Sequence, residues 1–537
     1  MGTLGRRLAV LAFLPACNAI FGVDDLTYVE GSGGTGGQGG GICSEGDTQP
    51  CYDGPVDTAD VGICASGEQA CVDDDWGPCT GEVFPGIETC AATDDEDCDG
   101  YDCADVVWAR LFGGPGEELA WSVAARTDGT LVVGGHHGPR ADLGGPVPAP
   151  TAEVSGYVAL LEETGEPRWV HGFDGAGTRY VTDVAVTPRG DVIALGIFDG
   201  TLELDGSLVA SAGGTDLFVL ALSPAGDVIW SQAFGSPSTE LAYGLDVGQD
   251  GEIVVAGYYG EAFSTGDVSL PAPIDADGFA LRIDDQGTPL AAHVLTGLGN
   301  EYPRDVVLHA DGDITVVGYF DGTLVIDNNP FTASGMNDAF ALRVTEGLQT
   351  RWVRAWGGPG TERLHGVAIT ADDGDALIGS LAGTVDFDGT SVTSFGDDDV
   401  LFAKMSAGGQ LAWVKHFGGA AEDWGFGVAV DDDGGIHISG HFQQGIVFGS
   451  ESHTGAASNN LFYARFDTAG LLERSRGFSF PGQTAPPYGW PSRRRLAIAP
   501  NGDAVIVTHL TDTATLDDQE LTTVAGSNDA LVVRLAH

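Results

Sequence analysis

Residues 230–257 of the chain read WSQAFGSPSTELAYGLDVGQDGEIVVAG, and versions of this phrase recur at intervals of 61 residues. The first position is tryptophan in five copies and another residue in two: Trp108, Trp169, Trp230, Ala291, Trp352, Trp413 and Arg474. Four positions later, all seven copies have an aromatic residue or leucine. A fixed period of this length is typical of propellers and solenoids, in which no single unit can bury its apolar face alone.

Each copy contains four short β segments separated by turn signals. Alternating aliphatic and small residues, as in Leu245–Val247, predict an innermost strand. A tight turn such as Asp250-Gly251 follows, and the second strand is predicted to end at a glycine such as Gly257. A third strand opens with a polar residue, and the tryptophan phrase forms the fourth, outermost strand. Because residues 106–537 show no helical periodicity, the sequence predicts an all-β, seven-bladed β-propeller.

The order of the strands predicts how the ring closes. The array begins with an outermost-type strand, residues 106–112, and finishes on a third-type strand, residues 530–535. We therefore expect the N-terminal strand to complete the last blade beside Val532 and Val533. Such an arrangement would leave no exposed sheet edge at the seam.

The repeated sequence motif also resembles that of a known family. Trp-x-x-x-Phe-Gly-Gly, followed by Val-Ala-Val, Asp-Gly, Gly-aromatic and Asp-x-Phe, resembles the SBBP repeat, a seven-bladed β-propeller repeat of bacterial surface proteins. The resemblance covers residues 106–537. It implies the fold and an extracellular setting, and it brings no catalytic residues with it.

The N-terminus indicates export. Arg6 and Arg7 precede a short apolar stretch, residues 8–14, which is too short to span a bilayer and is typical of a secretory signal. Leu14-Pro15-Ala16-Cys17 resembles a bacterial lipobox, so we expect a signal peptide over 1–16 and a lipid on Cys17 that holds the protein at the outer membrane or cell surface. The alternative is an ordinary signal peptide with a chance cysteine. Residues 17–41 are expected to form the lipidated N-terminus and a glycine-rich tether.

A cysteine-rich segment follows over residues 42–105. It holds eight cysteines, and none occurs after Cys103. An even, clustered set in an exported protein predicts four disulfides in a small acidic module. A zinc site is the alternative, and it is the weaker one because no histidine precedes His136. The wording Gln49-Pro50-Cys51-Tyr52 and Trp76-Gly77-Pro78-Cys79 resembles a cysteine-rich module, named for metal binding, on surface lipoproteins of myxobacteria.

The end of this module contains a candidate calcium loop. Carboxylates alternate there and a glycine, Gly100, follows the third: Asp95, Asp97, Asp99 and Asp102. Oxygen ligands at positions 1, 3 and 5 with glycine at position 6 are what a tight Ca²⁺ loop requires. The EF-hand glutamate is missing, because position 12 is Val106. A Ca²⁺ site and a solvated acidic linker both remain open interpretations.

The overall charge restricts the partners. The 78 acidic residues outnumber 23 lysines and arginines, which gives a formal net charge of −55. Such a field repels nucleic acid, so no nucleic-acid partner is expected. No nucleophile elbow, phosphate loop or zinc-peptidase helix occurs in the sequence. Carboxylates that recur in nearly every copy, such as Asp216 and Glu240, are expected to be structural.

Residues that depart from the repeat are the candidates for function. His136, His441 and His509 follow the second strand in the first, sixth and seventh copies, which ring closure would make neighbours. They predict either a metal site or a polar-aromatic rim. An insertion in the last copy supplies candidate ligand contacts, and the alternative is a solvated loop: Tyr488, Trp490, Arg493, Arg494 and Arg495.

These observations favour a cell-surface lipoprotein with a non-enzymatic role. We expect the propeller to bind an extracellular protein or glycan, or to serve as a structural part of the envelope. The alternative is a propeller enzyme, a polysaccharide lyase or hydrolase, with its site in the central funnel. The fold alone cannot decide between them, because function depends on sites carried by the fold.

Overall fold

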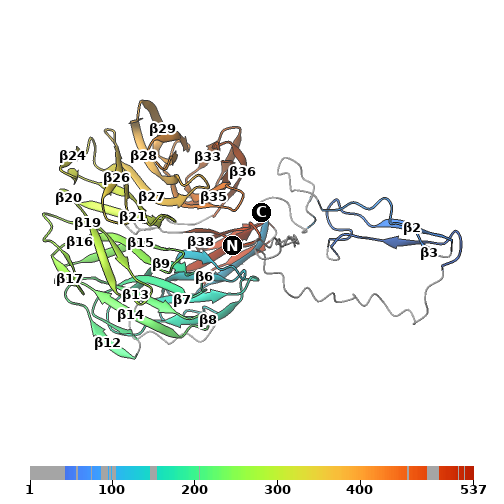
Figure 1. The fold of residues 1–537 in the computed structure, drawn as a ribbon, viewed down its shortest axis with the longest axis horizontal. Coiled ribbons are helices and arrows are strands. Elements are labelled where there is room, and N and C mark those ends of the chain that lie inside the picture. Colours follow the sequence, from blue (N-terminus) through green and yellow to red (C-terminus); the bar gives the residue numbers. More distant parts are fainter. Residues whose placement is uncertain are drawn as a thin grey trace, which may run out of the picture. The chain divides into compact units, whose positions relative to one another are not determined.

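The computed structural model describes residues 43–55, 58–73, 75–85, 95, 98, 105–144, 154–204, 206–455, 459–480, 495–517, 519–524 and 527–537. These residues form strands, turns and loops, with no helix among them (Figure 1). The described chain accordingly has no helix that could cross a membrane. It divides into two compact units, one formed by residues 43–53 and 66–82 and the other by residues 54–65 and those from 83 onward.

The small unit is a three-stranded antiparallel sheet held by disulfides. Its strands are β1 (Thr48–Cys51), β2 (Gly67–Val72) and β3 (Asp75–Trp76). Cys43 bonds Cys71 and Cys51 bonds Cys79, while a third disulfide, Cys64–Cys98, lies in the larger unit. The prediction of disulfides is thus confirmed for six cysteines, and Cys90 and Cys103 lie outside the described residues. A unit this small cannot bury a large core, so cross-links supply much of its stability.

The larger unit is an all-β propeller built from sheets of four antiparallel strands. In chain order these are, for the first three sheets, β5 (Leu119–Ala125), β6 (Leu131–His137), β7 (Ser155–Leu161), β8 (Pro167–Gly172); β9 (Arg179–Val186), β10 (Val192–Phe198), β13 (Asp216–Leu222), β14 (Val228–Phe234); β15 (Glu240–Val247), β16 (Ile253–Tyr259), β19 (Asp277–Ile283), β20 (Pro289–Leu298). The next three are β21 (Glu301–Leu308), β22 (Ile314–Phe320), β25 (Asp338–Val344), β26 (Thr350–Trp356); β27 (Glu362–Ile369), β28 (Asp375–Phe387), β29 (Thr390–Met405), β30 (Leu411–Phe417); β31 (Asp423–Val430), β32 (Ile436–Phe442), β35 (Asn460–Phe466), β36 (Leu472–Phe478).

The seventh sheet combines the two ends of the array. Its strands are β37 (Leu496–Ile498), β38 (Ala504–Thr511), β41 (Asn528–Leu535) and β4 (Val106–Phe112). Strand β4 pairs antiparallel with β41, and its Ala109 and Arg110 lie opposite Val533 and Val532. The seventh sheet also packs on the first, because a single buried apolar cluster contains Trp108 and Val532 together with residues of β5 to β7.

Short hairpins follow the second strand of several sheets. They are β11 (Thr201–Leu204) with β12 (Ser207–Ala210), β17 (Phe263–Thr265) with β18 (Val268–Leu270), β23 (Thr323–Ile326) with β24 (Asn329–Thr332), β33 (Gly445–Phe448) with β34 (Glu451–Thr454), and β39 (Thr513–Leu516) with β40 (Gln519–Thr522). Strand β23 pairs in addition with β20 of the preceding sheet.

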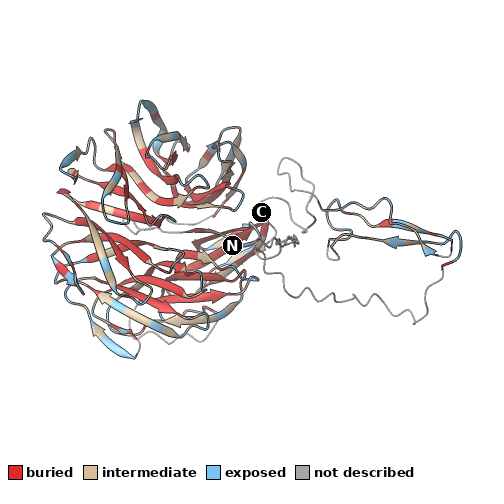
Figure 2. Ribbon diagram, in the orientation of Figure 1, coloured by how far each residue is buried: buried red, intermediate tan, exposed pale blue. Residues whose placement is uncertain are grey.

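The core lies between the sheets. Strands β10 and β13 are buried at every position, because both faces of each sheet pack on neighbouring sheets (Figure 2). One apolar cluster joins the second sheet to the third through residues such as Leu195 and Val255. Near-continuous apolar runs in the two middle strands therefore follow from burial on both faces, and burial of this kind is the main favourable contribution to folding.

The recurring tryptophans join each sheet to the next. In four copies the indole N–H donates to a carbonyl 55 residues further along, at 2.9–3.1 Å: Trp108 to Glu163, Trp169 to Pro224, Trp230 to Asp285 and Trp352 to Ala407. A turn glycine lies against each ring. Gly287 has φ +84°, and a Cβ there would lie 2.7 Å from a ring carbon of Trp230. The repeated tryptophan and glycine are therefore requirements of sheet-to-sheet packing.

The second strands run further than the sequence predicted. We expected the second strand to end at glycines such as Gly257, but β16 continues to Tyr259, as β6 continues to His137. The glycine is needed because the first strand bulges beside it: a Cβ on Gly257 would lie 2.2 Å from the carbonyl oxygen of Leu241. Strand pairing continues past that point, with Tyr259 opposite Asp277. The prediction of the strand end was wrong because a glycine inside a strand also permits a close backbone approach.

Candidate functional site

The recurring carboxylates bond backbone amides, as predicted. Asp216 accepts a hydrogen bond from the amide of Ala212 at 2.7 Å, and Asp399 accepts one from Phe395 at 2.9 Å. In the other column, Glu240 accepts from the amide of Ser236 at 2.7 Å. Positions with the same role in several sheets belong to the fold, so the candidate site must consist of residues that differ between copies.

A β-bulge in each of the first six inner strands presents one such column. The pairing register of the inner strand shifts at one residue per sheet, and that residue is different in every copy: Trp121, Thr182, Tyr243, Arg304, His365 and Phe426. Bulges re-aim side chains and are common beside functional sites. These bulge residues were not predicted from the sequence as candidates for function. The signal that could have revealed them is a change of residue type from copy to copy at one position, two residues before the aliphatic residue of the inner strand.

The bulges lie at one end of a central channel. The channel has a volume of about 350 Å³ and is lined by small and aliphatic residues from all seven inner strands, such as Val123, Val307 and Ala497. On each of the first six inner strands the bulge residue precedes the residues that line the channel. A second set of variable residues lies two positions before each bulge residue: Leu119, Tyr180, Leu241, Tyr302, Arg363 and Trp424. We call the end of the channel formed by these two sets the bulge end. Five residues of the second set are only partly buried, so aromatic and arginine side chains reach solvent there.

Tyrosines and arginines gather on one side of the bulge end. The guanidinium of Arg304 lies 4.7 Å from the ring centroid of Tyr243 and 5.0 Å from that of Tyr319. Its Nη2 donates to the Tyr319 hydroxyl at 2.5 Å. Tyr302 contacts both Tyr258 and Tyr319, with ring centroids 5.1 and 5.0 Å apart. Four tyrosines from two adjacent sheets thus surround one arginine. Tyr258 and Tyr319 occupy the same position of the repeat as His136, His441 and His509.

The predicted histidines lie on the other side of the bulge end. The rings of His441 and His509 are 6.4 Å apart, and His441 contacts the Thr508 hydroxyl at 3.1 Å. His136 instead accepts a hydrogen bond on Nδ1 from the indole of Trp121 at 2.7 Å. All three side chains are buried. The structure thus brings the rings of His441 and His509 into contact, whereas His136 is hydrogen-bonded to Trp121.

A metal-ligand cluster does not appear around these histidines. In the part of the chain that the structure describes, no group of three histidine, cysteine or carboxylate side chains is arranged to hold a metal ion. The contacts of the three histidines are those of the polar-aromatic rim, the second of the two interpretations.

Arg495 lies at the bulge end between aromatic side chains of the first and sixth sheets. Its guanidinium lies 4.9 Å from the ring of Phe426 in the sixth sheet and 5.9 Å from that of Trp121 in the first. Burial lowers the pKa of Arg495 to about 10. The other predicted contacts of the insertion, Tyr488, Trp490, Arg493 and Arg494, lie outside the described residues.

Burial sets the protonation of the aromatic and histidine groups. It lowers the pKa of His136 to about 3 and that of His441 well below its ordinary value. It raises the pKa of Tyr302 to about 12 and also raises that of Tyr258. At neutral pH His136 and His441 are therefore uncharged, and Tyr258 and Tyr302 keep their protons. These groups offer stacking surfaces and hydrogen-bond donors, and their pKa values are far from those of an efficient general acid or base.

The calcium loop and the lipidation site lie mostly beyond the described residues. Asp97, Asp99, Asp102 and Cys17 all fall outside them. Asp95 is described, and its backbone carbonyl accepts a hydrogen bond from the amide of Ile63 at 3.0 Å.

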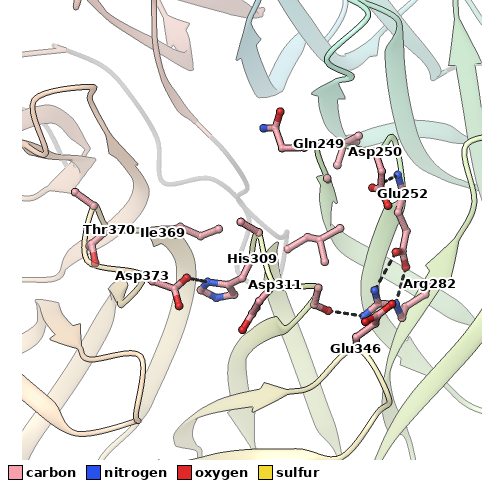
Figure 3. Close-up of a pocket in the computed structure, with 16 residues that line it drawn as sticks. Gln249, Asp250, Glu252, Arg282, His309, Asp311, Glu346, Ile369, Thr370 and Asp373 are labelled. Atoms are coloured by element: carbon pink, nitrogen blue, oxygen red, sulfur yellow. Dashed lines mark hydrogen bonds and ion pairs between the residues drawn. The ribbon is translucent and has the colours of Figure 1, made fainter. Parts of the chain in front are cut away.

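A larger cavity lies at the hairpin-turn end of the inner strands. It has a volume of about 600 Å³ (Figure 3). In its wall Arg282 pairs with Glu252, and His309 lies 3.0 Å from Asp373. The Arg282 pairing recurs in other sheets, where Arg343 pairs with Asp313 and Arg534 with Asp503. By the criterion of repetition, this wall belongs to the fold.

Comparisons with known proteins add little beyond the fold. The sequence matches no protein-family model and no curated protein. Similar solved structures include a polysaccharide lyase, an ulvan lyase bound to a glucuronate-containing saccharide, at 12% identity over 82% of this chain and 95% of that chain, with a TM-score of 0.34. An exotype rhamnogalacturonan lyase is 12% identical over 78% and 90% of the two chains, with a TM-score of 0.26. A gluconolactonase from Xanthomonas campestris is 15% identical over 65% and 90%, with a TM-score of 0.28. At these values the similarity carries no inference about activity.

Proposed function

We propose that this protein is an exported binding protein whose propeller holds a saccharide at the bulge end of the channel. The observation that carries the proposal is the set of partly buried aromatic side chains at the starts of three inner strands, Tyr180, Tyr302 and Trp424. Aromatic rings bury large apolar areas, and tyrosine and tryptophan also present a polar group at the edge. A sugar ring has the same combination of apolar faces and hydroxyl-bearing edges. Propeller strands would hold the aromatic faces in fixed positions, which reduces the entropic cost of binding.

The protonation states favour binding over catalysis. His136 and His441 are uncharged donors or acceptors at neutral pH, and Tyr302 keeps its proton. One observation supports the alternative of a polysaccharide lyase or hydrolase: histidines and aromatic residues that depart from the repeat converge on one end of the channel. Incubation of the protein with a saccharide ligand distinguishes an enzyme from a binding protein. An enzyme would release shortened or unsaturated saccharides, and a binding protein would return the ligand unchanged.

Export and attachment to a membrane complete the proposal. Three disulfides among the described residues are typical of an extracellular or secreted protein. We propose in addition that lipid on Cys17 anchors the chain and that the loop from Asp95 to Asp102 binds Ca²⁺. Retention of the Cys17→Ala variant in the membrane fraction would contradict the anchor. Absence of heat on calorimetric titration of the protein with Ca²⁺ would contradict the loop.

A saccharide-binding screen on residues 42–537 tests the main proposal. Tyr302→Ala and Trp424→Ala should each weaken binding of any saccharide found by about tenfold, since a buried aromatic contact contributes more than about 1 kcal/mol. Phe395→Ala is the matched control, because Phe395 is 65% exposed and lies outside the bulge end. Binding that is unchanged in both bulge-end variants, or a chain that binds no saccharide in the screen, would overturn the proposal.

A further inference from the structure

We infer that the saccharide at the bulge end carries anionic groups, and that Arg304 and Arg363 bind them. This inference rests on the proposed function and narrows it to acidic saccharides. The observation behind it is a pair of arginines whose charge is not balanced by an ion pair within the described structure.

Arg304 is buried without a carboxylate partner. It is 7% exposed, its Nη2 bonds a neutral tyrosine hydroxyl, and its Nε has no hydrogen-bond partner among the described residues. Some buried arginines of the propeller are paired, namely Arg282 with Glu252, Arg343 with Asp313 and Arg534 with Asp503. Arg179 and Arg495 resemble Arg304, because both are buried without an ion pair among the described residues. An uncompensated buried charge is costly. A bound anion would supply Arg304 with the charged partner that the described residues do not provide.

Arg363 brings a second positive charge to the same ring. Its guanidinium lies 5.3 Å from the centroid of Tyr319, the ring that Arg304 also contacts. Its Nη2 donates to the side-chain carbonyl of Asn337 at 3.2 Å, and its Nε has no described partner. Two carboxylates lie near this region: Asp321, whose charge acts on Tyr302, and Asp398, which accepts a hydrogen bond from the indole of Trp424 at 3.0 Å. Asp398 lies beyond ion-pair distance from Arg363, although its charge is felt there.

The two guanidinium groups fit the chemistry of an acidic sugar. Arginine presents several N–H donors in a planar fork that matches the oxygens of carboxylate and sulfate groups. A pyranose ring stacked on Tyr302 would place its substituents toward Tyr319, which both arginines flank. A uronic-acid carboxylate and a sulfate ester share this anionic-oxygen chemistry, and both are candidates.

Calorimetric titration of residues 42–537 with matched trisaccharides tests the inference. The probes are galacturonic acid trimer, the neutral galactose trimer and a sulfated galactose trimer. We expect one of the two acidic probes to bind at least about tenfold more tightly than the neutral one, because hydrogen bonds to charged groups contribute about 1.5–3 kcal/mol. The probe that binds more tightly identifies the anionic group.

Variants assign the effect to residues. Arg363→Gln should remove most of the preference for the acidic probe and leave binding of the neutral probe within about twofold. Arg304→Gln is the second variant, accepted only if its thermal midpoint matches the parent. Arg140→Gln is the control, since Arg140 is exposed and lies outside the bulge end.

The outcomes distinguish this inference from the proposed function. Equal affinity for acidic and neutral probes, with both weakened by Tyr302→Ala, would overturn the inference and leave saccharide binding in place. An acidic preference unaffected by both arginine variants would also overturn it. Failure of every probe to bind, while a broad saccharide screen also fails, would instead count against the proposed function.

Discussion

Glu301 belongs to a column of buried acids in which the other members accept hydrogen bonds from backbone amides. Glu240 accepts from Ser236 and Glu362 from Gly358, at 2.7 and 2.8 Å. For Glu301, the residue at the position of the donor Ser236 is Gly297, which lies in β20 and takes part instead in the pairing of β20 with β23. Neither carboxyl oxygen of Glu301 has a described partner. Burial raises the pKa of Glu301 to about 9.

This carboxyl group should make stability depend on pH. The pKa in the folded protein, about 9, exceeds the ordinary value of 4.5, so the folded state binds more protons than the unfolded state between these values. The contribution is fully present below pH 4.5 and is lost as pH rises toward 9. Glu301→Gln should therefore raise the free energy of unfolding at pH 8.5, by roughly 1–3 kcal/mol, and reduce its decline from pH 6.5 to 8.5. Thermal denaturation at both pH values measures this.

Glu240→Gln is the control for that experiment. It removes an acceptor that two groups of Ser236 use, so we expect no stabilisation at either pH. The buried histidines do not affect the difference in stability between the variant and the parent protein. The pKa values of His136 and His441 are lowered by burial, so both are neutral in the folded state. Their protonation in the unfolded state near pH 6.5 is the same in parent and variant, so it cancels in the difference between them. A Glu301→Gln variant that is less stable than the parent at pH 8.5 would contradict the assignment.

Among the structural elements, the outermost strands show how the repeat keeps neighbouring sheets together. Trp230 in β14 donates to the carbonyl of Asp285, in the turn between β19 and β20 of the following sheet. Trp413 in β30 occupies the same place, yet its indole nitrogen is buried without a described partner. The same position of the repeat therefore holds a tryptophan that donates a hydrogen bond in one sheet and a tryptophan without a described hydrogen-bond partner in another.

The two tryptophans should respond differently to the same substitution. Trp230→Phe removes a donor and leaves the Asp285 carbonyl without it, so we expect a loss of about 1–3 kcal/mol in the free energy of unfolding. Trp413→Phe removes an unsatisfied group and should cost clearly less. Denaturant unfolding of both variants measures the difference. Equal losses would indicate that ring packing, and not the hydrogen bond, carries the contribution.

At the scale of the whole molecule, the N-terminal strand of the array completes the last sheet. The amide of Ala109 in β4 donates to the side chain of Gln519, so it points away from β41. Because alternate amides of a strand point in opposite directions, the amide of Arg110 points toward β41. The two residues are neighbours with different roles in joining the ends of the chain.

Proline substitutions separate these roles. Arg110→Pro should remove a ladder hydrogen bond at the seam and lower the thermal midpoint by several degrees. It should also promote association through the exposed edge of β41. Ala109→Pro loses only the bond to Gln519 and should be tolerated much better. Thermal denaturation and size-exclusion chromatography measure both effects. Equal tolerance of the two prolines would show that β4 contributes little to the seam.

The sequence by itself determined the repeat, the strand order and the distinction between constant and variable positions. The 61-residue period required units that share a core, and the clustered cysteines required cross-links in a small unit. Constant residues such as Trp230 and Asp216 were interpreted correctly as structural because any function tied to one site cannot be repeated in every sheet.

Only the tertiary structure decided which variable residues meet. Tyr243 and Tyr258 are far in the chain from Tyr302 and Arg304, and the packing of adjacent sheets brings the two pairs into contact. The bulges were not predicted because the residue type at the bulge position differs from copy to copy, and Gly257 marks a close backbone approach that resembles a strand end in sequence. The sequence predicted the three histidines to be neighbours, and the rings of His441 and His509 are in contact. Their partners were not predictable, since ring contacts depend on how the sheets pack against one another.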